Sequence, residues 1–369
     1  MLQSSQSGVA GAAVIGGVQP RVILSSRVRL ARNLKDEHFP DWATAEERKA
    51  LLERLVPQVM WASEDAQARF FDMSTIAERE REVLKERWLV SSDLLKRSDG
   101  AGVVVAHGEA LAVMINEEDH VRIQSIHQGL SLMQCWEEAD ALDTSLDPIL
   151  PYAFSGRLGY LTACPSNVGT GMRASVMVHL PGLRLTGDID PVIKALERLN
   201  LNVRGTSGEG SMAAGLRFQV SNQGTLGMSE QAVIETLEHV ARKIEQQEIA
   251  ARLRVLRDAP TVFEDCLCRS LAMLKSARLM RADEALDYLS AIRMGMEMGM
   301  VRGVGLSRLE ELAMVVLPGH MQNFFDAELD PDERDERRAN LLGESFAACE
   351  IESKLIHESA LRLRTARRQ

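Results

Sequence analysis

The residues best suited to chemistry gather in residues 163–183, where a cysteine, a Pro-Ser-Asn turn, two glycines and an arginine follow one another closely. Gly169 and Gly171 let the backbone come close to a bound group, and turns of this kind can present N–H groups to an anion. Arg173 adds a planar set of donors that suits phosphate oxygens. A structural turn with a surface arginine explains this stretch equally well, so the rest of the chain must decide.

Two further arginines stand together near the start of the chain. Residues 21–34, RVILSSRVRLARNL, begin as a strand and then alternate arginines with apolar residues. Because side chains alternate along a strand, Arg27 and Arg29 point to the same side. Two guanidinium groups on one face repel each other unless an anion lies between them. The alternative is a solvated edge strand.

Two carboxylates lie in loops beside other arginines. Residues 116–124, NEEDHVRIQ, follow a predicted buried strand and place Glu118 shortly before Arg122. In RGTSGEG, which begins at Arg204, glycines flank the lone carboxylate of Glu209. A solvated loop would satisfy these polar groups. The competing interpretation is a site with a carboxylate base and phosphate-binding arginines.

The composition is that of a globular chain of 369 residues, 45% hydrophobic and 26% charged. A net charge of −10 argues against nucleic-acid binding, which normally needs a basic face. Five cysteines without a C-x-x-C pair favour a reducing cytoplasm and predict neither a disulfide framework nor a zinc site. No apolar run reaches the roughly 18 residues of a membrane span. Residues 1–20 lack the basic start of a signal peptide, and we interpret them as a flexible tail.

The elements that must position these residues show several local signals. Residues 102–106 and 110–116 predict two strands joined as a hairpin. Thr44 and Glu47 form a capping box that opens a helix, and Ser229 is placed to cap a long helix that reaches about residue 256. The pair Asp190-Pro191 predicts a helix with Asp190 as its N-cap.

From residue 260 the chain reads as nearly continuous helix. Small residues recur every four positions at Ala291, Gly295, Gly299 and Gly303, interleaved with methionines. This spacing permits close helix packing, and the methionines fill irregular gaps. We therefore expect either a helix-packing stripe or a dimer surface here.

Five motifs taken together resemble those of the phosphagen (guanidino) kinases, and most of all the bacterial protein-arginine kinases. They are SSRVRLARN, NEEDHVRIQ, CPSNVGTGMRASV, RGTSGEG and SNQGTLGMSE, in the family's order and spacing. The chain has no G-x-x-x-x-G-K-[ST] phosphate loop. The resemblance implies an α+β fold: a catalytic domain with an antiparallel sheet flanked by helices at residues 21–257, followed by an all-helical dimerisation and regulatory domain at residues 258–369.

The resemblance also implies roles for the residues above. Glu118 corresponds to the base that takes a proton from the substrate guanidinium, and Glu209 to a second carboxylate that clamps the same group. Cys164 corresponds to a cysteine beside that guanidinium, which we interpret as a positioning residue. ATP and Mg²⁺ are the implied cofactors, with no metal site formed by the protein itself. The nucleotide-phosphate arginines are Arg27, Arg29, Arg122, Arg173 and Arg204.

Two features favour the protein-arginine branch over kinases of small guanidino compounds. Those kinases carry a helical domain before the SSRVR strand, whereas 24 residues precede Ser25 here. The segment RDERRA resembles the branch's R-D-x-x-R-A pattern for a regulatory phosphoarginine site, which we assign to Arg334, Asp335 and Arg337. The alternative is a salt-bridged helix surface. Relatives usually carry an acidic residue where this chain has Met212, which puts local substrate preference or loop closure in doubt.

The resulting hypothesis is a cytoplasmic, ATP-dependent protein-arginine kinase that acts in protein quality control. It implies protein substrates bearing arginine, a homodimer, a zinc-binding activator protein and a Clp-type protease as partners, and neither nucleic acid nor membrane. Two alternatives stay open: a kinase of free arginine or another small guanidino compound, and a phosphoarginine-binding regulator with weak catalysis.

Overall fold

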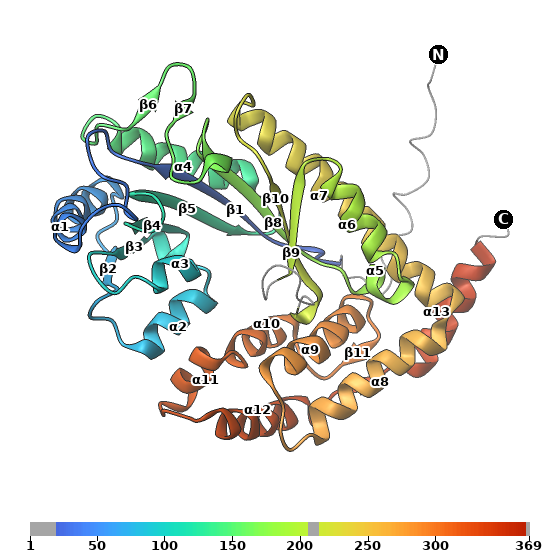
Figure 1. The fold of residues 1–369 in the computed structure, drawn as a ribbon. Helices are drawn as coiled ribbons and strands as arrows, with labels where there is room; N and C mark the ends of the chain where they lie inside the picture. Colours follow the sequence, from blue (N-terminus) through green and yellow to red (C-terminus); the bar gives the residue numbers. More distant parts are fainter. Residues whose placement is uncertain (1–19, 206–213, 367–369) are drawn as a thin grey trace, which may run out of the picture.

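The computed structural model describes residues 20–205 and 214–366, and within them an antiparallel sheet of eight strands dominates the first two thirds of the chain. The strand order across the sheet is β2-β3-β4-β5-β1-β8-β10-β9, so the strand nearest the N-terminus lies in the middle (Figure 1). The strands are β1 (Ile23–Arg32), β2 (Arg69–Asp72), β3 (Gly102–Ala106), β4 (Leu111–Ile115), β5 (Val121–Gln128), β8 (Met172–His179), β9 (Leu201–Gly205) and β10 (Arg217–Asn222). A separate hairpin is formed by β6 (Phe154–Ser155) and β7 (Gly159–Tyr160).

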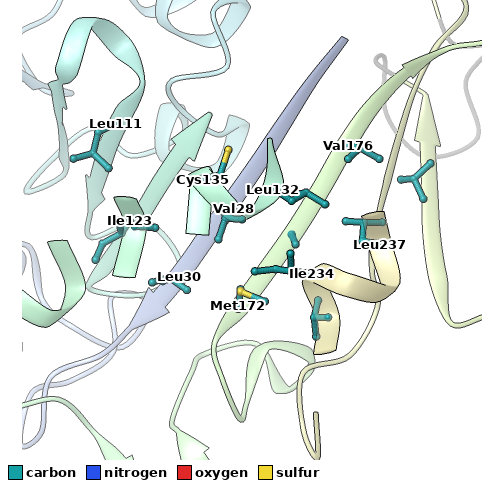
Figure 2. Close-up of a cluster of buried hydrophobic side chains, with 14 of the residues drawn as sticks. Val28, Leu30, Leu111, Ile123, Leu132, Cys135, Met172, Val176, Ile234 and Leu237 are labelled. Carbon is teal, nitrogen blue, oxygen red and sulfur yellow. The ribbon is translucent and has the colours of Figure 1, made fainter. Parts of the chain in front are cut away.

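Helices cover one face of this sheet completely and the other only in part. The main core lies beneath α1 (Ala45–Ala62), α4 (Leu132–Leu146) and α7 (Glu230–Asp258), and Figure 2 shows side chains from β1, β8 and α7 meeting there. A smaller core under α2 (Glu78–Glu86) and α3 (Ser92–Leu95) covers the opposite face of β3 and β4. Two short helices, α5 (Pro181–Thr186) and α6 (Ile189–Glu197), connect β8 to β9.

A second hydrophobic core occupies the helical C-terminal third of the chain. Figure 1 shows these helices gathered at one side of the sheet, beyond the end of α7. Buried methionines, including Met294 and Met300, fill this core. The helices are α8 (Pro260–Ser276), α9 (Ala282–Glu297), α10 (Leu306–Val315), α11 (Pro318–Phe325), α12 (Pro331–Phe346) and α13 (Ser353–Ala366), with a two-stranded ribbon of β11 (Val301–Arg302) and β12 (Glu350–Ile351).

The predicted α+β fold, a helix-flanked antiparallel sheet followed by a helical C-terminal region, is therefore confirmed. The hairpin of β3 and β4 forms as expected, joined through a 3₁₀ turn at His107–Glu109. Thr44 caps α1 with a complete capping box, and Ser229 caps α7 by accepting from the backbone N–H of Ala232.

Two local predictions were wrong. Helix α6 begins at Ile189 with Asp188 as its N-cap, so Asp190 and Pro191 lie inside the first turn. Proline is tolerated there because N–H groups of the first turn have no partner within the helix. The small-residue stripe does not run along one helix either, because α9 ends at Glu297 and Gly299 and Gly303 have positive φ angles.

The glycine within α9 shows what the small residues do. A side chain at Gly295 would come within 2.7 Å of Val301 and 2.9 Å of Leu267. Gly295 therefore serves packing inside the C-terminal core. It does not supply a surface for a second copy of the chain.

Candidate active site on the arginine face

The strand register brings the sequence-predicted arginines to one face of the sheet. Arg29 on β1 pairs directly with Arg173 on β8, and Arg27, two residues away, pairs with Ser175. On the other side of β1, Ala31 pairs with Arg122 of β5. Since directly opposed residues share a face and alternate residues return to it, all four arginines project to the same side.

Arg204 extends the row to the sheet edge. It pairs with Gln219 of β10, which in turn pairs with Met177 of β8, four residues from Arg173 and on the same face. The intervening residues of β1, Val28 and Leu30, point the opposite way into the main core and are fully buried. We call the side that carries Arg27, Arg29, Arg122, Arg173 and Arg204 the arginine face.

Arg27 and Arg29 are half-buried, and neither donates to a carboxylate among the described residues. Within the described residues neither guanidinium makes a hydrogen bond or an ion pair, although that of Arg27 lies 5.8 Å from the centre of the Trp88 ring. Burial, followed by the charges of Arg173 and Arg122, lowers the pKa of Arg27 to about 10. Burial and the charge of Arg27 likewise lower the pKa of Arg29, against an opposing effect of Glu117. Such crowding of positive charge favours binding of an anion.

Arg122 differs because three acidic residues surround it. Glu117 contacts its guanidinium, Glu118 Oε2 accepts from its Nη2 at 3.1 Å, and Asp119 lies 3.9 Å away. Burial alone would lower the pKa of Arg122, but these three charges outweigh it and raise the pKa. Arg122 thus joins the arginine face to a cluster of carboxylates.

The three carboxylates are not equivalent. The side chains of Glu117 and Asp119 are fully buried, whereas that of Glu118 is 36% exposed. Burial raises the pKa of Glu118, Arg122 opposes the rise, and the charges of Asp119 and Glu117 add to it. Glu118 is therefore the member of this group placed to exchange a proton with a ligand.

Buried hydrogen bonds fix the acidic turn between β4 and β5. Asn33 donates to Asp119 at 2.6 Å and accepts from the backbone N–H of His120. His120 Nδ1 accepts from Leu34 N–H at 3.0 Å, and its Nε2 lies 2.8 Å from the carbonyl oxygen of His38. Burial lowers the pKa of His120, so it is a neutral structural residue.

Cys164 approaches this turn through its neighbour. Asp119 Oδ1 accepts from the backbone N–H of Ala163 at 2.8 Å, which holds the segment before the 3₁₀ turn Pro165–Asn167 against the acidic cluster. The Cys164 thiol is partly exposed and lies 3.0 Å from the hydroxyl of Ser166.

The sequence-predicted Glu209 and the substitution at Met212 lie outside the described residues. The chain resumes at Ala214, where the backbone N–H of Gly215 donates to Asp287 of α9 at 2.7 Å. Gly215 is therefore held against the C-terminal helices.

Two adjoining cavities open onto the arginine face, one of about 110 Å³ and one of about 440 Å³. Arg27, Trp88 and Arg217 line both cavities. The smaller cavity is otherwise formed by apolar and small polar groups of β1, β5, β8 and β10. The larger one is closed by residues of α9, α10 and the start of α11, including Leu286, Met314 and Pro318.

Trp88 owes its position to an unusual backbone conformation. It follows α2 with φ of 63°, in the left-handed region that usually takes glycine at a helix C-terminus. The N–H groups of Trp88 and Leu89 bond back to Lys85 and Leu84, as in a Schellman motif, and the Trp88 carbonyl accepts from Gln124 at 2.7 Å. Sequence reasoning missed Trp88, because neither this conformation nor its contact with Arg27 has a local signature.

The residues predicted to bind phosphoarginine lie on α12. Arg334 donates to the carbonyl oxygen of Leu329, and the guanidinium of Arg337 lies 4.9 Å from the centre of the Phe325 ring. Counted from Arg334, the R-D-x-x-R-A pattern ends at Arg338 and Ala339, so Arg337 falls on a variable position. Arg338 is buried and donates to Asp335 at 2.5 Å, besides the carbonyl oxygens of Val316 and Met280.

The fold and the arginine face define an enzyme of the guanidino phosphotransferase class, and comparison with known proteins agrees. A family model for the ATP:guanido phosphotransferase C-terminal catalytic domain matches residues 52–251. The solved structure of a lombricine kinase is similar with a TM-score of 0.52 and 26% identity, covering 65% of this chain and 69% of that one. A duplicated taurocyamine kinase from Schistosoma mansoni shares the fold, with a TM-score of 0.55, 20% identity and coverage of 77% and 47% of the two chains.

The relatives are more specific. A second family model, described as the protein-arginine kinase McsB C-terminal domain, matches residues 260–357. Protein-arginine kinases of Pelotomaculum thermopropionicum and Geobacillus thermodenitrificans are each 41% identical to this chain. The first match covers 90% of this chain and 94% of the relative, and the second 89% and 91%. The chain belongs to the protein-arginine kinase family, which confirms the resemblance seen in the motifs.

Proposed function

We propose that this protein is an ATP-dependent kinase that phosphorylates arginine side chains of proteins. The observation that carries the proposal is the arginine face, on which five guanidinium groups gather beside the partly exposed carboxylate of Glu118, whose pKa is raised. The family supports the same substrate, because the relatives are protein-arginine kinases. In this proposal, residues 21–257 form the catalytic domain and residues 258–369 the dimerisation and regulatory domain.

The nucleotide lies along the arginine face with its phosphates on the guanidinium groups. Arg27, Arg29, Arg122, Arg173 and Arg204 supply the positive charge that phosphoryl transfer requires. The nucleobase of ATP enters the smaller cavity, where the indole of Trp88 offers a stacking surface. Because this face is cationic, Mg²⁺ is expected to be held by the phosphate oxygens of ATP, where it neutralises charge during transfer. Among the described residues no group of three or more acidic, histidine or cysteine side chains is arranged to hold a metal ion.

The chemical step needs a base because a guanidinium nitrogen has no free lone pair and its ordinary pKa is above 12. Glu118 accepts a proton from the substrate guanidinium as that nitrogen bonds to the γ-phosphorus. The bond between the γ-phosphorus and its bridging oxygen breaks, and ADP leaves with the electron pair. Glu209 clamps the same guanidinium as a second carboxylate, and Cys164 positions it.

We also propose a regulatory phosphoarginine site on α12, formed by Arg334, Asp335 and Arg337. Arg338 is buried and donates to Asp335, so it holds the side chain of Asp335 in place on this helix. Arg334→Ala should keep basal turnover and lose the response to added phosphoarginine, measured as a rate ratio. An unchanged ratio rejects the regulatory assignment.

The resemblance alone extends the proposal to a cytoplasmic homodimer, a zinc-binding activator protein, a Clp-type protease and a role in protein quality control. Among the described residues, no helix is both long enough and apolar enough to cross a bilayer.

The deciding experiment incubates the protein with Mg-ATP and either an unfolded arginine-rich protein or free arginine. Acid-labile phosphate is then located by mass spectrometry. Label on protein arginine supports the proposal. Label on free arginine alone assigns the chain to kinases of small guanidino compounds. If neither substrate is labelled even when the activator is supplied, the chain is a phosphoarginine-binding regulator.

A further inference from the structure

Arg217 is a sixth arginine on the arginine face, and neither the sequence motifs nor the family match singles it out. It is the first residue of β10 and pairs with His179 of β8. Gln219, two residues on, pairs with Arg204 and shares its face. Arg217 therefore projects to the same side as the phosphate-binding arginines proposed above.

The Arg217 guanidinium has no partner in the described part of the chain: it makes no hydrogen bond and no ion pair there. Its side chain is half-buried at the wall of both cavities, and burial followed by the charge of Arg293 lowers its pKa to about 10, against an opposing effect of Glu310. A half-buried cation whose donors have no acceptor among the described residues leaves those donors available to a ligand. A ligand that brings hydrogen-bond acceptors would satisfy them.

The position of Arg217 along the sheet indicates which part of a ligand it meets. On β8, the residue opposite Arg217 is His179, six positions from Arg173, which corresponds to roughly 20 Å along a strand. Glu118 and Arg122 lie towards the Arg173 end. If the γ-phosphate is transferred beside Glu118, the nucleobase lies at the end of the face that carries Arg217.

The cavity lining agrees with this placement. Arg217 lines the smaller cavity together with Trp88, Ser175, Met177 and Gln219. In that cavity a ring stacked on Trp88 would turn its edge towards the β10 side chains. Gln219 has an amide that can donate or accept, but a guanidinium can only donate. Arg217 therefore offers only hydrogen-bond donors to the edge of a bound nucleobase.

We propose that Arg217 is a specificity-determining residue that donates to the nucleobase edge, so that 6-oxopurine nucleotides bind at least as tightly as adenine nucleotides. Arginine forms paired hydrogen bonds with O6 and N7 of a 6-oxopurine, a pairing well known from guanine. Adenine carries an amino donor in place of O6, which opposes the guanidinium. The proposal rests on the proposed function only in placing a nucleotide on this face.

The test is calorimetric titration of the intact protein with IDP and with ADP, which requires no phosphoryl transfer. We expect the wild-type protein to bind IDP no more weakly than ADP. In Arg217→Met, IDP affinity should fall at least tenfold and ADP affinity less than threefold. Arg217→Lys keeps the charge but loses the planar fork, and it should shift the ratio in the same direction. Arg198→Met, at an exposed position on the loop after α6, is the matched control and should leave both affinities unchanged.

Two results overturn the proposal. An equal loss for IDP and ADP means that Arg217 contacts ribose or phosphate. No loss for either nucleotide means that it contacts neither. Arg217 makes no hydrogen bond or ion pair among the described residues, so Arg217→Met should keep the melting temperature of the ligand-free protein, and a thermal melt run before the titration checks that the variant is folded. Kinase activity is measured separately, so a protein that binds nucleotide but labels no arginine contradicts the proposed function and leaves this inference standing.

Discussion

Two groups of arginines in the described part of this molecule differ in how deeply they are buried and in which groups surround them. Between α5, α7 and α9, Arg252 donates to Glu248 at 2.6 Å and to Glu297 at 2.7 Å, and Arg293 donates to Glu297 at 3.0 Å. We call Glu248, Arg252, Arg293 and Glu297 the ionic cluster. On the arginine face, Arg27, Arg29 and Arg217 have no such carboxylate among the described residues.

The contrast shows in the protonation equilibria. Burial alone lowers the pKa of an arginine, yet the charges of Glu248 and Glu297 outweigh burial and raise the pKa of Arg252. At Arg27 burial is joined by other arginines, and the pKa falls. The same residue type thus stabilises the fold in one place and is held ready for an anion in the other. The bonded carboxylates and the deeper burial of the ionic cluster together separate the two roles.

The largest expected effect concerns Glu118, the carboxylate beside the arginine face. Glu118→Gln removes the proposed base while keeping the size and hydrogen bonding of the side chain. Loss of a general base typically costs about 10²–10⁴-fold in rate. The measurement is the single-turnover rate of arginine phosphorylation, with nucleotide affinity as the control. A rate within a few-fold of the wild type would remove Glu118 from this role.

The comparison itself is tested by one substitution made in each region. Arg252→Met leaves Glu248 buried without a counter-charge and leaves Glu297 with Arg293 alone, which should cost about 3–5 kcal/mol of unfolding free energy. Arg29→Met removes a cation that makes no hydrogen bond or ion pair among the described residues, so the unfolding free energy should stay the same or rise. Its nucleotide affinity should instead fall about 10–100-fold, because a hydrogen bond to a charged group contributes about 1.5–3 kcal/mol.

Denaturant titration and calorimetry on both variants separate the two outcomes. The distinction fails if Arg29→Met destabilises the fold as much as Arg252→Met. It also fails if both variants lose nucleotide affinity equally while remaining folded.

A smaller effect is expected in the pH dependence. Burial raises the pKa of Glu118 above its ordinary 4.5, with Arg122 opposing and Asp119 and Glu117 adding to the rise. The base must be ionised, so kcat/KM should fall as the pH drops through this raised pKa. Asp119→Asn removes one of the charges that raise it and should move the acid limb to lower pH. A limb that stays in place, or moves upward, assigns the titration to another group.

The sequence predicted the arginine pair on β1 because strand periodicity alone puts Arg27 and Arg29 on one side. It did not by itself bring Arg122 and Arg173 to them, since that depends on which strands pair and in which register. The family motifs supplied that step. Arg217 and Trp88 escaped both approaches. Arg217 gains its meaning only when β10 aligns with β8, and Trp88 only when a left-handed residue ends α2.

The misjudged start of α6 and the misread glycine stripe share a physical reason. Proline fits any position of a first helical turn, so Pro191 cannot fix where the helix begins. A four-residue spacing of small residues resembles a helix stripe even where the chain has left the helix, as at Gly299. Local sequence patterns of this kind are compatible with several backbone conformations, and tertiary contacts determine which of them forms.

The ionic cluster has a consequence for how parts of such proteins can be recombined. Helix α7 carries Glu248 and Arg252, whereas Arg293 and Glu297 belong to α9, on the far side of the turn at Ala259 that joins α7 to α8. Glu248 also accepts from the backbone N–H groups of Gly182 and Leu183, next to the end of β8. A chimaera spliced at that turn would combine the charged residues of α7 from one homologue with those of α9 from another. Exchange of C-terminal helices between homologues should therefore succeed only if the splice lies upstream of Glu248, so that most of the charge set travels as one inherited unit.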